Sequence, residues 1–323
     1  MSVYYVMLSS NTAVSFVDTN SIQVYRRRSQ EKSWNRLSDL VSTLPYPHAT
    51  ALAQYVSCDP DELVAHAREF IEAALALGAY AAYSESCIRK GRGETRVFHG
   101  FSQRSIGPLW KLLQDSLRLL GKNAELSAPF HELLTEEFYD LLNSTITFLS
   151  QEKHGKGDST DTVRPVQIFA NISQKVFDAQ HFGYFAQVQK QRFAREYEGR
   201  FIHAHGTSPF LQISTYRGTA SFSQDQAIIL DPDKKSGFSL EPLVFWEQCA
   251  KHPDLDSGHC FLYDKEPKPG VFSFKAAGFT CHLEVSKDGP YALLAEQLTK
   301  MKEKDLPKEM LDVGALSDIT EAW

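Results

Sequence analysis

Apolar residues recur at helical spacing between residues 129 and 149, a pattern typical of an amphipathic helix: Phe130, Leu133, Leu134, Phe138, Leu141, Leu142 and Leu149. The segment Asp59-Pro60-Asp61-Glu62 combines a capping residue, an early proline and acidic side chains, so it predicts the start of a helix that runs to about Tyr83. Two further helices are expected at about 106–120 and 129–149, with a short strand around Val97 before them.

Strand patterns occur at both ends of this helical region. Near the N-terminus, short β-branched or aromatic runs predict strands at Tyr4–Leu8, Val14–Val17 and Ile22–Tyr25. A longer strand-rich region is expected from Phe201 to Val285, interrupted by one helix near 240–251.

Residues 151–164 contain a single apolar residue, Val163, and are therefore the best linker or exposed-loop candidate. After this segment, Val166–Ala170 reads as a strand and Gln174–Glu198 as a polar helix. A last helix begins after Asp288-Gly289-Pro290, and the polar residues from about 304 are expected to form a docked or frayed tail.

The order of these elements favours an α+β fold, because strands and helices do not alternate regularly as they do in a doubly wound sheet. We expect an Arg-rich, strand-containing and helix-rich N-terminal region at 1–150, then the linker or exposed loop at 151–164. A strand-rich, mixed-sheet C-terminal domain with peripheral helices follows at 165–323.

Composition narrows the class of protein. The 323 residues are 42% hydrophobic and 23% charged, which excludes a mostly disordered, collagenous or coiled-coil chain. The net charge of −6 is unevenly spread: residues 1–120 carry ten Arg, whereas residues 206–323 carry one Arg and eleven Lys. Arg suits phosphate recognition better than Lys, so a polyanion-binding surface is expected in the N-terminal half.

Membrane insertion and secretion are not expected. The longest uncharged apolar stretch, Ala73–Ser84, has twelve residues, whereas a spanning helix needs about 20. The N-terminus has no signal-peptide pattern, and five widely spaced cysteines suggest reduced thiols. We therefore expect an intracellular, cytoplasmic protein.

Three groups of basic residues are candidates for phosphate or nucleic-acid contact. The first two contain Arg26, Arg27 and Arg28, and then Arg89, Lys90, Arg92 and Arg96 beside Gly91 and Gly93. The third contains Lys190, Arg192, Arg195 and Arg200. Glutamates are interspersed among all three groups, so an ordinary solvated surface is the alternative interpretation.

Candidate catalytic residues are fewer. His203 and His205 would share one face of a strand, and Asp231 and Asp233 follow an apolar run, where carboxylates can act as a metal ligand or general base. The alternatives are an exposed histidine pair and an ordinary turn. His48-Ala49-Thr50 and His205-Gly206-Thr207 match a two-histidine phosphoesterase pattern only as often as chance predicts.

Zinc is a further alternative, with Cys249 and His252 as a chelating pair at a helix end. The neighbouring His259-Cys260 and Cys281-His282 pairs would point to opposite faces of strands, and Cys260 is expected to be a buried free thiol. The sequence contains no complete Rossmann, P-loop, zincin, α/β-hydrolase or EF-hand motif.

The sequence thus favours an intracellular binding protein that contacts nucleic acid or another polyanion through its Arg-rich N-terminal half, as part of a larger complex. The acidic C-terminal half would suit a protein partner or a second copy of the chain. The alternative is a metal-dependent phosphodiesterase or nuclease-like hydrolase that uses His203, His205, Asp231 and Asp233. The sequence does not identify a cofactor.

Overall fold

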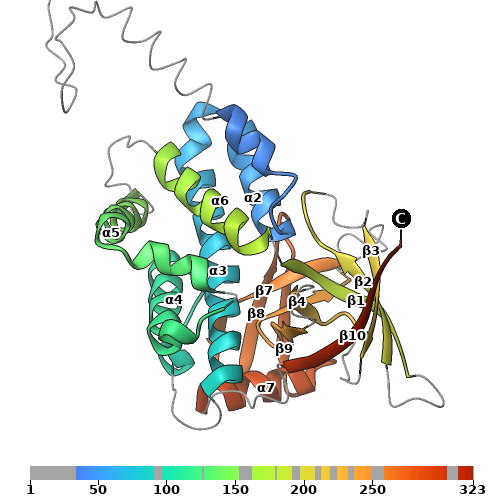
Figure 1. Ribbon diagram of the computed structural model, residues 1–323. Helices are drawn as coiled ribbons and strands as arrows, with labels where there is room; N and C mark the ends of the chain where they lie inside the picture. The colour runs from blue at the N-terminus through green and yellow to red at the C-terminus, as the bar shows by residue number, and fades with distance from the viewer. Residues whose placement is uncertain are drawn as a thin grey trace, which may run out of the picture.

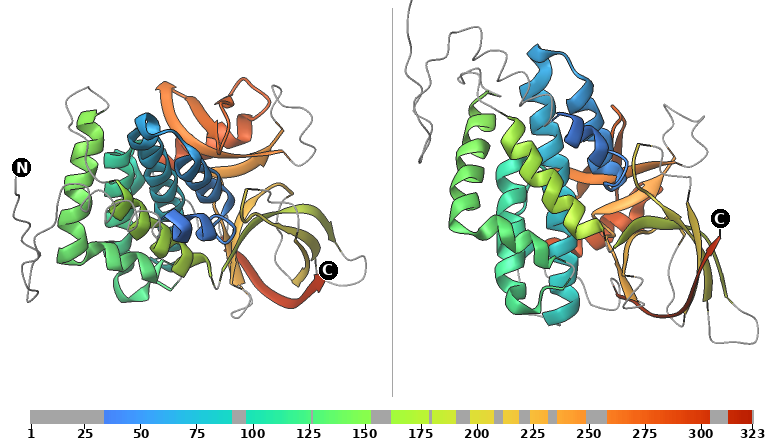
Figure 2. Two further views of the ribbon diagram at one scale, coloured as in Figure 1. Left: turned by 90° about the horizontal axis from the view of Figure 1, so that it is seen from above. Right: turned by 45° about the horizontal axis from the view of Figure 1, so that its top comes forward.

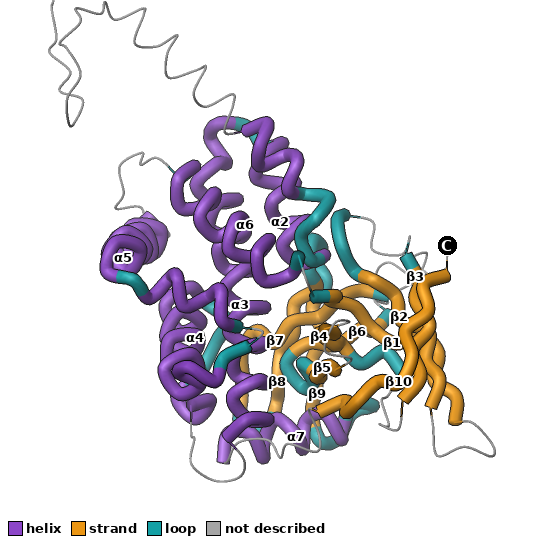
Figure 3. The backbone as a smooth tube through the Cα atoms, viewed as in Figure 1, coloured by secondary structure: helices purple, strands orange, loops and turns teal. Residues whose placement is uncertain are grey.

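The computed structural model describes residues 34–90, 97–125, 127–152, 162–178, 180–190, 197–207, 212–218, 224–231, 236–248, 258–303 and 312–322. Helices form one side of the molecule and strands the other (Figures 1 and 3). The fold is therefore α+β, as the sequence predicts. Among the described residues, no helix is long and apolar enough to cross a membrane.

The helical side begins with the helical residues 34–40 and is built around one long central helix. Its elements are α2 (Tyr46–Ser57), η1 (Pro60–Glu62), α3 (Leu63–Lys90), η2 (Val97–Gly100), α4 (Ile106–Leu120), η3 (Gly121–Asn123), η4 (Ala128–Leu134), α5 (Glu136–Glu152) and α6 (Val163–Phe177). The central helix, α3, packs against α2, α4 and α6. Small side chains make this close packing feasible, because Ala74, Ala76, Ala79 and Ala82 are fully or almost fully buried.

The strand side contains two antiparallel sheets. A closed barrel has the order β1 (His181–Lys190), β2 (Tyr197–His203), β3 (Ile213–Gly218), β10 (Asp312–Ala322), β5 (Ser236–Ser239) and β4 (Ala227–Asp231). The second sheet has the order β6 (Val244–Glu247), β7 (His259–Lys268), β8 (Val271–Ala276) and β9 (His282–Ser286), and α7 (Ala292–Glu303) packs beside it. Figure 2 shows the helices, the sheet and the barrel as three adjacent bodies.

The barrel encloses a small core of its own. Phe185, Phe201, Tyr216, Ile228 and Leu230 form this interior cluster, in which the rings of Phe201 and Tyr216 lie 5.3 Å apart. Gly183 permits the tight β1–β2 contact, because a Cβ there would lie 2.0 Å from the Ile202 carbonyl oxygen.

A much larger core joins all the other parts of the fold. It includes Leu75 of α3, Phe169 of α6, Trp246 of β6 and Phe274 of β8. Backbone hydrogen bonds add to this packing: Tyr46 N–H donates to the Ala204 carbonyl at 2.8 Å, and the α2 end of the bundle is thereby tied to the barrel.

Several predicted elements are confirmed. The helix that begins after Asp59, the helix at 106–120, the helix after Pro290 and the strand-rich region are all present. The helix expected at 129–149 is divided at Thr135, whose extended backbone separates η4 from α5. The predicted N-terminal strands lie outside the described residues.

Other predicted elements are wrong. Residues 163–177 are helical where a strand was expected at 166–170, because their buried side chains recur at helical spacing: Val166, Phe169, Ala170, Ser173, Val176 and Phe177. The expected polar helix at 174–198 contains the end of α6, β1 and the start of β2. The helix expected near 240–251 contains β6, and the strand expected around Val97 is the 3-10 turn η2. The polar tail contains β10, which closes the barrel.

The division of the chain at residues 151–164 stays a prediction. Helix α6, which follows it, packs against α3 and η4 of the N-terminal region.

Candidate functional site

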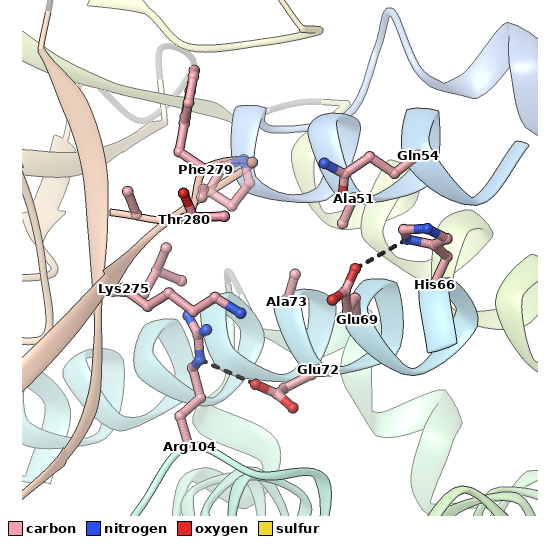
Figure 4. Close-up of a pocket in the computed structure, with 15 residues that line it drawn as sticks. Ala51, Gln54, His66, Glu69, Glu72, Ala73, Arg104, Lys275, Phe279 and Thr280 are labelled. Atoms are coloured by element: carbon pink, nitrogen blue, oxygen red, sulfur yellow. Dashed lines mark hydrogen bonds and ion pairs between the residues drawn. The ribbon is translucent and has the colours of Figure 1, made fainter. Parts of the chain in front are cut away.

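A hollow lined by both acidic and basic side chains lies where α2 and α3 meet the second sheet (Figure 4). It is an open cleft of about 290 Å³. Polar and apolar side chains line it together: Gln54, His66, Glu69, Glu72, Arg104, Lys275 and Thr280 beside Pro47, Ala51, Ala73, Leu262, Ala276, Ala277, Gly278 and Phe279.

Helix α3 supplies the acidic wall of this cleft. Glu69 lies three residues after His66, and Glu72 and Ala73 lie three and four residues after Glu69, so all four occupy one face of the helix. The opposite wall is the turn after β8, where Gly278 has a φ of +73°. A Cβ at Gly278 would lie 3.0 Å from Cβ of Thr50, so glycine allows this turn to approach α2 closely.

The floor of the cleft carries a mostly buried ion pair. Arg104 Nε lies 3.3 Å from Glu72 Oε1 and 4.0 Å from Asp264 Oδ1, and the Arg104 side chain is only 9% exposed. Residue 104 is fixed in place because its backbone N–H donates to the Asp264 carbonyl. Lys275 reaches into the same region from β8 (Figure 4).

The Glu72 carboxyl is held in an unusual environment. Burial raises its pKa, and the positive charges of Arg104 and Lys275 offset part of that effect. A carboxyl with a raised pKa inside a cleft is a frequent feature of ligand and active sites.

The outer rim of the cleft holds a second polar pair. His66 Nδ1 lies 3.0 Å from Glu69 Oε2, and its Nε2 lies 3.8 Å from Glu62. The cleft therefore presents Arg104 and Lys275 in one region and Glu69 with His66 in another (Figure 4). The apolar side chains of Phe279 and Ala73 also line it.

A second hollow of about 260 Å³ lies at one end of the barrel. His203 and Ser214 lie two residues from Phe201 and Tyr216 on their strands and thus share the interior face of the barrel. His203 Nε2 and Ser214 Oγ are 2.6 Å apart, and the ring of His181 lies 4.5 Å from that of His203 and 6.4 Å from that of His205.

His203 and His205 are neutral near pH 7. Burial, with a smaller contribution from neighbouring histidines, lowers the pKa of His203 to about 3 and that of His205 to about 4. The structure thus brings the predicted pair together and adds His181, which sequence reasoning missed. Among the described residues, no group of three or more His, Cys, Asp or Glu side chains is arranged to hold a metal ion.

Asp231 is not part of this hollow. Ile228 and Leu230 face the barrel interior, so Asp231, one residue further along β4, faces outward. It is paired with Ser236, the first residue of β5, in the antiparallel register of the two strands. Asp233, Cys249 and His252 lie outside the described residues.

The predicted basic clusters are only partly visible. Arg26, Arg27, Arg28, Arg92 and Arg96 lie outside the described residues, as does the side chain of Lys90. Arg89 is held in a structural network, with Nε 2.9 Å from Glu85 Oε1 and Nη2 2.9 Å from Glu125 Oε2.

Two residues of the third cluster, Lys190 and Arg200, lie on β1 and β2 of the barrel and not at the end of a polar helix, whereas Arg192 and Arg195 lie outside the described residues. Lys190 ends β1, with its ammonium 6.0 Å from the centre of the Tyr197 ring, and the exposed Arg200 lies on β2. His48 lies at the start of α2 with no exposed surface, so a substrate in solution has no access to it.

The cleft residues were missed because nothing local distinguishes them in the sequence. Glu69 and Glu72 belong to an ordinary helix, and Arg104 and Lys275 come from segments far along the chain. Comparison with protein-family models, with curated proteins and with solved structures finds no match to this chain.

Proposed function

We propose that this protein binds a small zwitterionic molecule, of the size and chemistry of a free amino acid, in the cleft between α2, α3 and the second sheet. The observation that carries this proposal is the arrangement of opposite charges in one cleft, with Arg104 and Lys275 on one side and Glu69 on another. Its volume, about 290 Å³, is near the roughly 300 Å³ at which ligand pockets begin.

The chemistry of the cleft supports this ligand class. A ligand carboxylate would meet Lys275 and the Arg104 guanidinium, whose hydrogen bonds to carboxylates are charge-assisted. A ligand ammonium would meet Glu69, and an apolar side chain would lie against Phe279 and Leu262. A ligand with only one of the two charges would make a charge-assisted contact with only one of these two regions.

A thermal-shift panel tests the proposal. It contains L-leucine, L-phenylalanine, L-glutamate and L-arginine, together with isocaproate and isoamylamine, which each keep one charge of leucine. We expect at least one zwitterion to raise the melting temperature by a few degrees at saturation, because a ligand at 100 times its Kd adds about 2.7 kcal/mol to the free energy of unfolding. The singly charged analogues should give at most a small shift.

Two variants locate the site. Lys275→Met should abolish the shift, since it removes the cation that reaches into the cleft. Lys265→Met is the matched control, because Lys265 is exposed on the neighbouring strand β7 and does not line the cleft. The proposal fails if no zwitterion shifts the melting temperature, or if isocaproate and isoamylamine act as strongly as leucine.

Contact with nucleic acid or another polyanion is a second candidate function. With β10 set aside, the strand order β1-β2-β3-β5-β4 is that of OB-type barrels, which bind oligonucleotides through the face of their second and third strands. Exposed Arg200 lies on this face and Lys190 beside it, which supports the expectation drawn from the basic clusters. Shared topology alone does not assign a function, so the charges must carry the test.

Fluorescence anisotropy with a single-stranded oligonucleotide tests this second candidate. Two phosphate contacts on single-stranded nucleic acid give a salt slope of about −1.4 in log K against log[salt]. The double variant Lys190→Glu and Arg200→Glu should remove that part of the slope, whereas Lys265→Glu with Lys287→Glu should not. Equal losses from both pairs would indicate nonspecific charge attraction and would contradict the assignment.

The described residues do not support the alternative of a hydrolase that uses His203, His205, Asp231 and Asp233. His203 faces the barrel interior and Asp231 faces outward, so the two do not meet in one site. A neutral His203 whose pKa is lowered to about 3 is also a weak general base near pH 7.

A further inference from the structure

A third hollow, of about 440 Å³, lies between the barrel, the second sheet and the start of α7. Its wall comes from four places in the chain: the turn before β4, the turn before β6, β6 itself and the first turns of α7. The lining residues that matter are Asp225, Glu241, Phe245, Trp246, Glu247 and Tyr291.

The charged side chains among the described residues that line this hollow are all acidic. Asp225, Glu241 and Glu247 line it, and no Lys, Arg or His is among the described residues that do so. Among the described residues no such acidic group is arranged to hold a metal ion. The carboxylates are therefore spread around a space larger than an ion.

The backbone fixes Asp225 firmly in this wall. Its φ of +60° is a left-handed conformation that Asp tolerates better than most residues. The Asp225 N–H donates to the Phe185 carbonyl at 2.8 Å, and its carbonyl accepts from Trp246 N–H at 3.1 Å. These two hydrogen bonds fix the turn that carries the Asp225 carboxylate at the wall of the hollow.

Glu241 is the least satisfied group of the hollow. Among the described residues its carboxylate has no hydrogen-bond or ion-pair partner, and only its backbone N–H is bound, to Ser239 Oγ. Burial, with a smaller contribution from the nearby Asp225 charge, raises the pKa of Glu241 to about 7. A mostly buried carboxyl without a partner is costly to keep in its charged form unless a cation accompanies it.

The other titratable groups that face Glu241 do not supply that cation. Burial and the Glu247 charge raise the pKa of Asp225, although a hydrogen bond from Gln224 lowers it in part. Tyr291 bonds to Glu247, and burial with that contact raises the pKa of Tyr291 to about 12. Asp225, Glu247 and Tyr291 are therefore all acids and supply no positive charge. Tyr291 is a neutral hydrogen-bond donor near pH 7.

The rest of the wall is aromatic and apolar. Phe245, Trp246 and Tyr291 line the hollow, and the faces of aromatic rings attract organic cations. Leu293, which also lines it, is 77% exposed and therefore adds accessible apolar surface to the wall. Carboxylates beside aromatic rings match a cation that is carried on an apolar body.

We propose that this hollow binds an organic cation, a primary ammonium or a guanidinium group attached to an apolar or aliphatic chain. Such a group can donate hydrogen bonds to Glu241 and Asp225 while its chain lies against the rings. The same chemistry occurs in free amines and in Lys or Arg side chains of peptides, and separate arms of one experiment distinguish these sources.

Isothermal titration calorimetry with the full chain tests the proposal. The probes are 2-phenylethylamine, its uncharged counterpart 2-phenylethanol, agmatine, and acetyl-arginine-amide as the peptide arm. We expect binding of the cations and not of 2-phenylethanol. Tighter binding of acetyl-arginine-amide than of both free amines assigns the site to a peptide, and the reverse assigns it to a free amine.

Proton release identifies Glu241 as the responsible group. A bound cation favours the ionised carboxylate, so binding at pH 7 should release about half a proton and affinity should rise from pH 6 to pH 8. Titrations in phosphate and in Tris measure this release, because the two buffers differ in their enthalpy of ionisation.

Three variants complete the test. Glu241→Gln should lose the proton release and weaken cation binding at least tenfold, and Asp225→Asn, which keeps the tolerance for positive φ, should weaken it as well. Glu303→Gln, at the other end of α7, is the matched control. Binding of 2-phenylethanol as tight as that of the amine, absence of cation binding, or unchanged binding in both hollow variants would overturn the proposal.

Discussion

At the scale of single residues, the buried carboxylate of Glu85 gives Arg89 a structural role. Glu85 is 2% exposed, and it accepts hydrogen bonds from Arg89 Nε at 2.9 Å and from the backbone N–H groups of Glu125 at 2.7 Å and Ser127 at 2.9 Å. Arg89 therefore neutralises a buried charge and joins α3 to the segment before η4.

Replacing Arg89 by Glu is expected to destabilise the protein strongly. A second negative charge beside Glu85 removes its counter-ion, and breaking a buried pair costs about 3 kcal/mol of the free energy of unfolding. Arg118→Glu is the control, since Arg118 is 59% exposed and its pair with Asp115 should contribute less than about 1 kcal/mol. Urea unfolding of both variants measures the difference, and equal stabilities would show that Arg89 is an ordinary surface residue.

Buried neutral histidines predict sensitivity to acid. Burial lowers the pKa of His48 to about 3, below the value near 6.5 of the unfolded chain. The unfolded state therefore binds more protons below pH 6.5, and the free energy of unfolding falls as the pH falls from 6.5 toward 3. Each such histidine contributes up to about 1.4 kcal/mol per pH unit.

His48→Leu should therefore make the protein less sensitive to acid. Leucine keeps an apolar contact with Phe177, whose ring lies 5.9 Å from that of His48. Unfolding measured at pH 7, 6, 5 and 4 should show a shallower loss in the variant than in the wild type. Parallel pH profiles for the two proteins would contradict a neutral, buried His48.

At the scale of elements, the sequence predicts the helices better than the strands. α4 was predictable because Leu109, Leu113 and Leu117 repeat along one buried face, and Gly121 with a φ of +52° ends the helix. β1 was not predictable, because its first half is buried on both faces and shows no alternation of apolar and polar residues.

β10 was missed for a different reason. Its partners, β3 and β5, are distant in the sequence, and the charged stretch at 302–309 that precedes it resembles a solvated tail. Pairing of this kind is set by the fold around it and is invisible to a local pattern.

A variant that ends at Glu303 tests the role of β10. Its removal leaves β3 and β5 with unpaired edges, so the amides of both strands should lose protection in hydrogen-exchange mass spectrometry. β7 and β8, in the second sheet, should stay protected and serve as the internal control. Unchanged exchange in β3 and β5 would show that β10 is dispensable, and loss throughout the chain would show that barrel and sheet unfold together.

At the scale of the whole molecule, the candidate sites lie where the separate bodies of the fold meet. The cleft joins α2 and α3 to the second sheet, and the hollow at Glu241 joins the barrel to β6 and α7. His203 and His205 could be paired from the sequence because they share one strand and its continuation. Glu72, Arg104 and Lys275 could not, because only the packing of α3 on the sheet brings them together.

The most direct test of the central claim is NMR of the protein labelled at its alanine methyl groups, titrated with the zwitterion that gives the largest thermal shift. The methyls of Ala51, Ala73, Ala276 and Ala277 line the cleft, whereas Ala204 and Ala227 lie at the barrel. We expect the first four signals to move together with one Kd, while those of Ala204 and Ala227 stay in place. Movement confined to Ala204 and Ala227, or to Ala292 beside the Glu241 hollow, would contradict binding in the cleft.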